Sequence, residues 1–310
     1  MLNLQELLAF MAQHTGFWIT VWVILGALFG SFFNAMAWRW PQMINREWLE
    51  EIKAGFDGQQ WAFPAEAQEE LDKPKIGFSF PRSQCPHCHS PIPIWRNVPI
   101  FSWLALRGKC ADCHAPISPR YLFVEIGCAV LGGVLAAFLA PSVPALCLLG
   151  FCFTLALIAA IDAASFYIPD ALSYGLLWAG LMAHALGWIP GSAQSAIYGA
   201  LIGFLFLRAI GWLGRVLFKR EALGLGDSKL LAAQLAWLGG MALPPLLIAA
   251  SFLGILVAFV GWAISRATGR PGRAQREIPF GPYLAIAGVL CIFFETPFWA
   301  HFGVLAYFGM

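Results

Sequence analysis

Charged residues are scarce in this sequence. Asp, Glu, Lys and Arg make up 12% of the 310 residues, whereas 59% of the residues are hydrophobic. A soluble globular domain carries about 25% charged residues and about half apolar ones. The shortage of charge therefore excludes a soluble globular protein and indicates a chain that lies in a lipid bilayer.

The sequence also lacks the usual marks of a secreted protein. The first 18 residues contain no Lys or Arg, and no small-residue cleavage site follows the first apolar run. We therefore expect a retained membrane helix there and not a signal peptide. Four of the eight cysteines stand alone in apolar runs, where cysteine is typically a small buried hydrophobic residue and not part of a disulfide framework: Cys128, Cys147, Cys152 and Cys291.

Apolar segments long enough to cross a membrane recur along the chain. A helix needs about 20 apolar residues to span the hydrocarbon. The segment at 229–242 is short and bounded by glycines, so it can be a tilted, broken or re-entrant span. We predict an all-α polytopic membrane protein of about eight transmembrane helices, at 17–38, 121–139, 143–162, 171–189, 194–214, 229–242, 244–265 and 281–306.

Basic residues are absent from alternate loops. The short turns that contain Pro141 and Pro190 have no Lys or Arg, whereas ten of the 19 basic residues lie between Arg39 and Arg120. The other nine lie at 208–229 and 266–276. Because positively charged loops stay on the cytoplasmic side, we expect the basic loops to be cytoplasmic and both termini to be periplasmic.

These patterns divide the chain into three predicted parts. They are a first transmembrane helix at 1–38, a cytoplasmic insert at 39–120 and a seven-helix membrane domain at 121–310. Between Gln42 and Pro81 the insert is polar and rich in glutamate. We expect a solvated helical extension there, with an acidic surface that would also attract a basic peptide.

Four acidic residues fall within or at the ends of the predicted spans. A carboxylate at the centre of a membrane helix costs at least about 2.5 kcal/mol, so its presence there indicates a functional role. At the end of a span the headgroup region is wet, and the cost is small. The four residues are Glu125, Asp162, Asp170 and Asp227. For Glu125 a functional role and a plain position in the wet interface are equally weighted, and for the three aspartates the local sequence decides.

Asp162 and Asp227 stand beside helix ends in a way that suits a shared site. Asp162 ends an apolar segment, and Asp227 begins another one after Gly224-Leu225-Gly226, where glycine permits bending and close backbone approach. Two carboxylates in one site repel each other and so keep one proton between them. The ionised acid then activates a water and the protonated acid polarises a carbonyl, as in an aspartic peptidase. Alternatively, Asp162 is an interfacial residue and Asp227 is a helix N-cap.

The remaining four cysteines form two Cys-x2-Cys pairs. Cys85 and Cys88 are separated by 21 residues from Cys110 and Cys113. Such pairs are typical of a structural zinc site with four thiolates and no open position. The competing interpretations are two disulfides or a redox pair, which a cytoplasmic location disfavours, or a site in which a histidine replaces one thiolate. The histidines near the pairs are His87, His89 and His114.

Short motifs accompany the aspartates and the cysteines along nearly the whole chain. They are Gly30-Ser31-Phe32-Phe33-Asn34, Arg39-Trp40-Pro41, Asn97-Val98-Pro99-Ile100-Phe101-Ser102-Trp103, Arg107-Gly108-Lys109-Cys110, Pro116-Ile117-Ser118-Pro119-Arg120-Tyr121 and Ile278-Pro279-Phe280-Gly281-Pro282. With these motifs the chain resembles the type IV prepilin peptidases, which are GxGD-type intramembrane aspartyl proteases. The family usually has Gly after each cysteine pair, where this chain has His89 and His114, and Pro where it has Leu122.

The resemblance implies an aspartic endopeptidase of the bacterial inner membrane. Its substrates would be type IV prepilins or type II secretion pseudopilins, cleaved after a short basic leader that precedes a hydrophobic helix, at the cytoplasmic face. The chain would contact membrane lipids and no nucleic acid. The family's catalytic pair corresponds to Asp162 and Asp227, with Gly224, Gly226 and Asp170 in supporting positions, although Asp170 can instead cap the following helix.

The resemblance also implies a second activity, N-methylation of the new N-terminus with S-adenosylmethionine, which the family associates with the insert. No glycine-rich nucleotide loop is present in the sequence, so we predict no cofactor-binding residue. A peptidase without methyl transfer is one alternative. The alternatives from other classes are a non-enzymatic assembly factor and an ion-coupled transporter, whose usual internal repeats are not visible.

Overall fold

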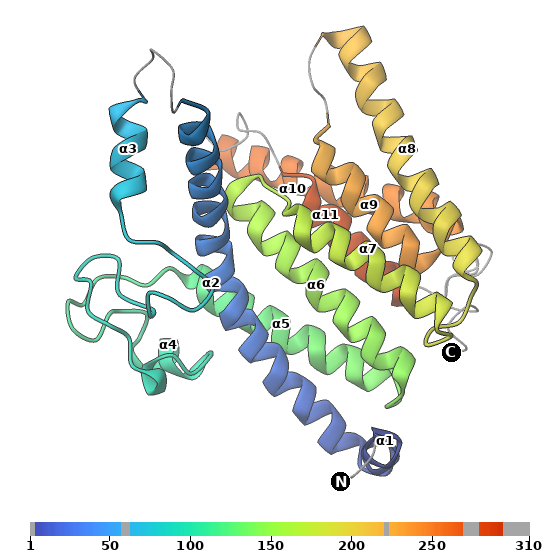
Figure 1. The fold of residues 1–310 in the computed structure, drawn as a ribbon. Coiled ribbons are helices and arrows are strands. Elements are labelled where there is room, and N and C mark those ends of the chain that lie inside the picture. The colour runs from blue at the N-terminus through green and yellow to red at the C-terminus, as the bar shows by residue number, and fades with distance from the viewer. Residues whose placement is uncertain (1–3, 57–62, 220–222, 269–278, 294–310) are drawn as a thin grey trace. The chain divides into compact units, whose positions relative to one another are not determined.

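The computed structural model describes residues 4–56, 63–219, 223–268 and 279–293, and these residues form helices without a β-strand (Figure 1). The predicted all-α fold is therefore confirmed. The α-helices are α1 (Leu4–Gln13), α2 (Thr15–Phe56), α3 (Ala65–Asp72), α4 (Phe101–Ala105), α5 (Pro119–Phe138), α6 (Val143–Ser165), α7 (Asp170–Ala185), α8 (Ala193–Phe218), α9 (Leu225–Leu238), α10 (Leu243–Thr268) and α11 (Gly281–Phe293), and the 3-10 helices are η1 (Ile94–Arg96) and η2 (Gly240–Ala242).

A helix occupies each of the eight segments that hydropathy predicts as a span. Helices α7, α9 and α11 have fewer than 18 described residues, and the predicted last span continues past 293 into residues outside the described part. Within the described residues, five helices are long and apolar enough to cross a membrane: Thr15–Gly55, Pro119–Phe138, Val143–Ser165, Ala193–Leu217 and Gly240–Thr268.

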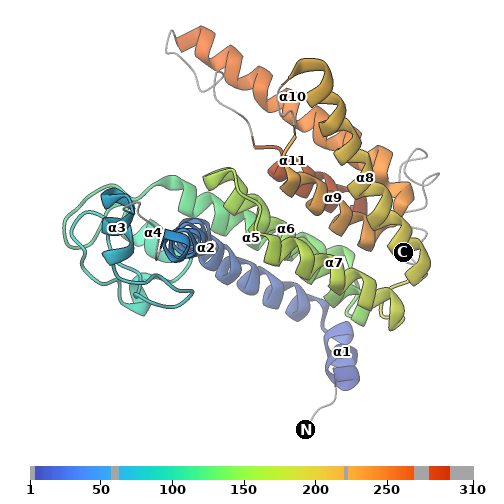
Figure 2. The same ribbon diagram turned by 45° about the horizontal axis from the view of Figure 1, so that its top comes forward.

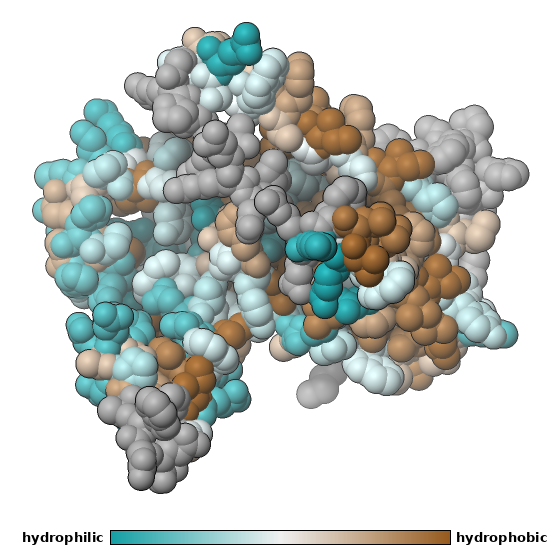
Figure 3. Space-filling view, turned by 90° about the horizontal axis from the view of Figure 1, so that it is seen from above, coloured by the Kyte–Doolittle hydropathy of each residue, from teal (hydrophilic) through white to brown (hydrophobic). Residues whose placement is uncertain are grey.

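Contacts divide the chain into two compact units. One comprises residues 1–18 and 135–310, and the other comprises residues 19–134. We call them the helical unit and the cysteine unit. Figure 3 shows one face of the molecule, on which hydrophilic side chains gather towards the left and hydrophobic ones towards the right. The borders of the insert at 39 and 120 stay predictions.

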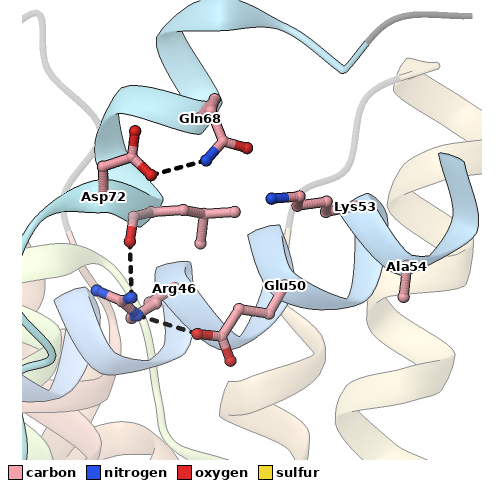
Figure 4. A pocket seen from close by; sticks show the side chains of 7 residues that line it. Arg46, Glu50, Lys53, Ala54, Gln68 and Asp72 are labelled. Atoms are coloured by element: carbon pink, nitrogen blue, oxygen red, sulfur yellow. Dashed lines mark hydrogen bonds and ion pairs between the residues drawn. The ribbon is translucent and has the colours of Figure 1, made fainter. Parts of the chain in front are cut away.

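Helix α2 does not end where the first predicted span ends. It continues through Pro41 to Phe56, because the residues beyond Trp38 include good helix formers such as Leu49, Glu50 and Glu51. Helix α3 joins it through Arg46 (Figure 4). The Arg46 guanidinium donates to the backbone oxygens of Leu71 and Lys73, each at 2.7 Å, and so satisfies carbonyls at the end of α3. The predicted helical extension is thus a pair of helices.

Glycines bring α2 and α5 into backbone contact in the cysteine unit. A Cβ atom on Gly26 would collide with the carbonyl of Cys128, and one on Gly30 would lie 2.7 Å from the Cα of Glu125. Small residues four apart are a common device for packing membrane helices closely. The motif around Gly30 therefore sets the approach of the helix that carries Glu125.

Helix α9 lies at the centre of the helical unit, where it packs against α7, α8 and α11 (Figures 1 and 2). Ten of its side chains are buried. Trp237 donates from Nε1 to the Leu176 oxygen of α7 at 2.7 Å, and Gln234 donates from Nε2 to the Leu284 oxygen of α11 at 2.9 Å. These bonds fix α9, and with it the segment that begins at Gly224.

Candidate active site

Asp162 lies one turn before the end of α6 and is buried, with 4% of its surface exposed. The helix ends because Phe166 adopts a left-handed conformation and donates its backbone N–H to the Asp162 carbonyl at 2.8 Å. The side-chain atom Oδ2 has no hydrogen-bond partner in the described structure. A buried carboxylate oxygen without a partner is ready to hold a proton or bind a ligand.

Asp227 is the third residue of α9 and is half-buried. Gly224 is the N-cap residue, so the alternative that Asp227 itself is the N-cap is wrong. The carboxylate of Asp227 instead accepts the backbone N–H of Gly224, as the acidic residue of a capping box does. This bond holds the side chain at the start of the helix, where the helix dipole favours negative charge.

The structure brings the two aspartates into one cluster, where their carboxyl groups interact electrostatically. Ile168 lies beside Gly226, which precedes Asp227, and beside Gly281, which lies against Asp162. A Cβ atom on Gly226 would lie 3.0 Å from the Ile168 Cβ, and one on Gly281 would lie 3.0 Å from its Cδ1 and 2.5 Å from the Asp162 Oδ2. The site is therefore assembled where α6 ends and where α7, α9 and α11 begin, on one side of the helical unit (Figure 1).

Asp170 does not cap α7 with its side chain, because the N-cap residue is Pro169. Its two carboxylate oxygens instead accept from Lys229 Nζ at 2.6 and 2.7 Å. Lys229 also lies over the ring of Tyr174, 5.2 Å from the centroid. This ion pair joins the start of α7 to the first turns of α9, two residues beyond Asp227.

Two contributors to this cluster escaped the sequence reasoning, Lys229 and Gly281. Lys229 stands close to Asp227 in sequence, but its partner is 59 residues away, so only the fold shows the pairing. Gly281 was part of a motif without an assigned role. Gly281 directly follows Pro279-Phe280 and begins an apolar segment, and this position was the signal that the sequence offered.

The four clustered cysteines are brought together in the cysteine unit. Their sulfur atoms all lie within 4.8 Å of one another, and Cys85 Sγ is 3.8 Å from Cys113 Sγ. A tetrahedral zinc ion with bonds of about 2.3 Å would separate its sulfur ligands by about 3.8 Å. No histidine belongs to the cluster found in the described part of the chain, and the cysteines are free thiols. The donor set therefore fits a metal ion.

The two cysteine pairs lie in two separate tight turns of the same kind. The N–H of His89 donates to the Cys85 carbonyl at 2.9 Å, and the N–H of His114 donates to the Cys110 carbonyl at 3.1 Å. Both histidines have positive φ values, 56° and 57°. This conformation favours glycine, which explains why the family's usual residue there is Gly and why histidine, which tolerates the left-handed region better than most residues, can replace it.

Cys85 is also prepared electrostatically for a metal. Backbone N–H groups of Cys88 and then His87 donate to the Cys85 sulfur and lower the pKa of that thiol to about 6. The thiolate is the form that binds metals. Among the isolated cysteines, Cys128, Cys152 and Cys291 are buried, as predicted, and Cys147 is half-buried.

Two family models match the chain, one after the other. Residues 24–139 match the Bacterial Peptidase A24 N-terminal domain, and residues 149–259 match the Type IV leader peptidase family. The second match contains both Asp162 and Asp227, and the first contains the four clustered cysteines. No solved structure matches the chain.

Curated relatives match over most of their length. A protein of Burkholderia pseudomallei (strain 1026b) is 38% identical over 297 residues, which cover 96% of this chain and 92% of the relative. One of Aeromonas hydrophila is 40% identical over 87% of this chain and 88% of the relative, and one of Pseudomonas putida is 37% identical over 94% and 96%. Each is named a prepilin leader peptidase/N-methyltransferase. The chain belongs to the type IV leader peptidase family.

Proposed function

We propose that this chain is a membrane aspartic endopeptidase that removes the leader of prepilins, with Asp162 and Asp227 as its catalytic pair. The observation that carries the proposal is the cluster of the two acids at the ends of α6 and α9, with an unpartnered buried oxygen on Asp162. The family membership and the names of the relatives supply the substrate class. Pseudopilins with the same basic leader and hydrophobic helix belong to that class.

The pair can perform hydrolysis without a nucleophilic side chain or a metal. Because like charges repel, the two carboxyl groups hold one proton between them. The ionised acid takes a proton from water as the water oxygen attacks the scissile carbonyl, and the protonated acid donates to the carbonyl oxygen. When the C–N bond breaks, a carboxyl group protonates the leaving nitrogen, which becomes the new N-terminus of the pilin.

The glycines let the protein pack closely around the acids. Gly224 and Gly226 precede Asp227, and Gly281 lies against Asp162. A Cβ atom at Gly226 would lie 3.0 Å from Ile168 and one at Gly281 would lie 2.5 Å from Asp162 Oδ2, so these glycines position the acids by close approach. The Asp170–Lys229 pair positions α7 relative to α9 and takes no part in proton transfer.

The experiment that tests the pair is leader removal in membranes by Asp162→Asn and Asp227→Asn. Each variant is expected to lose about 10²–10⁴-fold in rate, the usual contribution of a general acid or base. Asp72→Asn, an exposed carboxylate at the end of α3, is the matched control and is expected to cleave normally. Full processing by either site variant would remove that residue from the mechanism.

We infer that the cysteine cluster holds a structural zinc ion and that the chain N-methylates the new terminal amine. Cys85, Cys88, Cys110 and Cys113 would fill the zinc shell and leave no open position for substrate. When bound, S-adenosylmethionine supplies a methyl group to the deprotonated amine, and the C–S bond electrons return to sulfur. The relatives' double name supports this second activity.

We also infer that the insert at 39–120 and the other basic loops face the cytoplasm and that the termini face the periplasm. The inference rests on the concentration of Lys and Arg between 39 and 120. Trypsin should cut at the exposed Arg107 and Lys109 in inverted vesicles and leave them intact in right-side-out vesicles. The opposite protection pattern would reverse the topology.

A further inference from the structure

The motifs that the peptidase chemistry leaves unused surround one cavity in the cysteine unit. The cavity has a volume of about 630 Å³, within the range of about 300–1,000 Å³ that small-molecule sites occupy. Its walls come from α2, both cysteine turns, the segment around η1 and the first turns of α5. Motif residues on these walls include Asn34, Asn97, Ser102, Ser118 and Tyr121.

Glu125 is the buried acid of this cavity. It is 8% exposed, and within the described residues it forms no ion pair with Lys or Arg. Its Oε2 accepts the backbone N–H of Ile100 at 2.7 Å and leaves the rest of the carboxylate free of a positive partner. A buried carboxylate is matched best by a cation, and a ligand that enters the cavity can supply one.

The loop that Glu125 holds is strained. Ile100 has φ 65° and ψ −56°, and the N–H of Phe101 donates to the Pro99 carbonyl at 2.7 Å, which makes a γ-turn of the rare positive-φ kind. A β-branched residue in this conformation is an outlier that persists only when its surroundings enforce it. Glu125 enforces it here and thereby fixes the loop that bears Asn97 and Ser102 along the cavity.

The other lining groups fit a ligand with an anionic end and a flat ring. The side chain of Arg96 is 42% exposed and pairs with Asp112 through Nη1 at 3.3 Å, so the other N–H groups of its guanidinium can bind a ligand carboxylate. Trp38 is 52% exposed and Trp103 lies on another wall, so aromatic surfaces are available for a purine base or a cation. Arg39 is already committed, because it donates to three carbonyls, those of Gly77, Phe78 and Pro81.

We propose that this cavity is the S-adenosylmethionine site of the chain, with Glu125 as the carboxylate that recognises the positive charge of the ligand. Arg96 recognises the ligand's carboxylate, and Trp38 and Trp103 provide aromatic surface. The proposal rests on the proposed methyl transfer and assigns it a place. It also explains why a carboxylate persists in an apolar helix of the cysteine unit, which the peptidase mechanism leaves without a role.

Equilibrium binding of radiolabelled S-adenosylmethionine to the full-length protein in nanodiscs tests the assignment without measuring turnover. Glu125→Gln keeps an oxygen that can accept from Ile100 but removes the charge, and it should weaken binding at least tenfold. Trp38→Leu should weaken binding several-fold. The matched controls are Glu50→Gln and Trp48→Leu on the far part of α2, which lie outside this cavity and should bind as the wild type does.

The metal content of each variant reports whether the cysteine unit is folded, because its four thiolates bind only when the two turns are in place. Unchanged binding by folded Glu125→Gln and Trp38→Leu proteins would overturn the assignment of this cavity. Another outcome would contradict the proposed methyl transfer and not only the place assigned to it. A wild-type protein that removes leaders but binds no S-adenosylmethionine would end the methyl-transfer proposal and leave the peptidase proposal standing.

Discussion

Each aspartate of the candidate site lies against a glycine where a side chain would be crowded. A Cβ atom on Gly281 would lie 2.5 Å from Asp162 Oδ2, and one on Gly224 would lie 3.2 Å from Asp227 Oδ2. Contacts below 3.0 Å force an atom to move, so the glycine at 281 is the stricter requirement. Neither glycine is needed for a positive φ value, since both serve close approach.

Gly281→Ala should therefore displace the Asp162 carboxyl group and lower the rate of leader removal about 100-fold, since misplacement by about 1 Å can cost that much. The measurement is the initial rate of prepilin cleavage in membranes. Gly150→Ala in α6, where a Cβ meets nothing within 4 Å, is the control and should cleave normally. Equal rates for the two variants would show that Gly281 does not position Asp162.

Two histidines in the cysteine turns carry a conformational cost that glycine would remove. His89→Gly and His114→Gly should each stabilise the metal-bound turn by about 1 kcal/mol or less, because a left-handed conformation costs most L-residues about 1–2 kcal/mol and glycine loses more entropy on folding. The expected result is slower release of metal to a chelator. His87→Gly, at a position without positive φ, should not slow the release, and equal behaviour of all three variants would contradict the account.

At the level of helices, hydropathy predicts eight segments, each of which contains a helix in the structure, but it does not predict how these helices pack. The burial of α9 on several sides depends on glycines of other helices, such as Gly180 of α7 and Gly203 of α8, whose missing side chains admit Trp237 and Leu235. Such pairings join residues far apart in sequence, so local pattern cannot reveal them. The sequence places the end of the first span at Trp38 because the apolar run ends there. The residues that follow still have high helix propensity, so α2 continues to Phe56.

The sequence predicts which acids form the site more readily than how they are held. Asp162 and Asp227 stand out because they interrupt apolar segments. The ion pair of Asp170 with Lys229 depends on the packing of α7 against α9, and for that reason Asp170 was also interpreted as a helix cap. The side chain of Lys229 is only 12% exposed, so its charge requires a partner.

Charge reversal tests this link between α7 and α9. Asp170→Lys and Lys229→Asp should each lower leader removal about tenfold, because each leaves like charges in contact, and the double exchange should restore part of the activity. Lys75→Asp, which opposes Glu50 in an exposed pair at 3.1 Å, is the control and should have no effect, as expected of surface pairs. Failure of the double exchange to recover any activity would count against the pair as a positioning link.

The molecule as a whole separates its chemistry between two compact units. The aspartates belong to the helical unit, and the cysteine cluster and the proposed S-adenosylmethionine cavity belong to the cysteine unit. Metal binding contributes free energy only to the part of the chain that holds the ligands. The two activities should therefore respond differently to removal of the metal.

A strong chelator should open the cysteine turns and make the exposed Arg107 and Lys109 far more sensitive to trypsin. It should also abolish binding of S-adenosylmethionine, because both cysteine turns form part of the cavity wall, while leader removal persists. Cys110→Ser with Cys113→Ser should behave as the chelated protein does. Loss of leader removal together with binding would show that the peptidase site depends on the metal.

The central claim is that Asp162 and Asp227 act as one catalytic unit, and the most direct measurement is a double-mutant cycle on leader removal. Residues that act as a unit are strongly non-additive, so removal of either costs about as much as removal of both. Asp162→Asn, Asp227→Asn and the double variant should therefore all fall to the same residual rate. A double variant that is slower than both single variants by the product of their separate losses would show that the two acids work independently and would contradict the account.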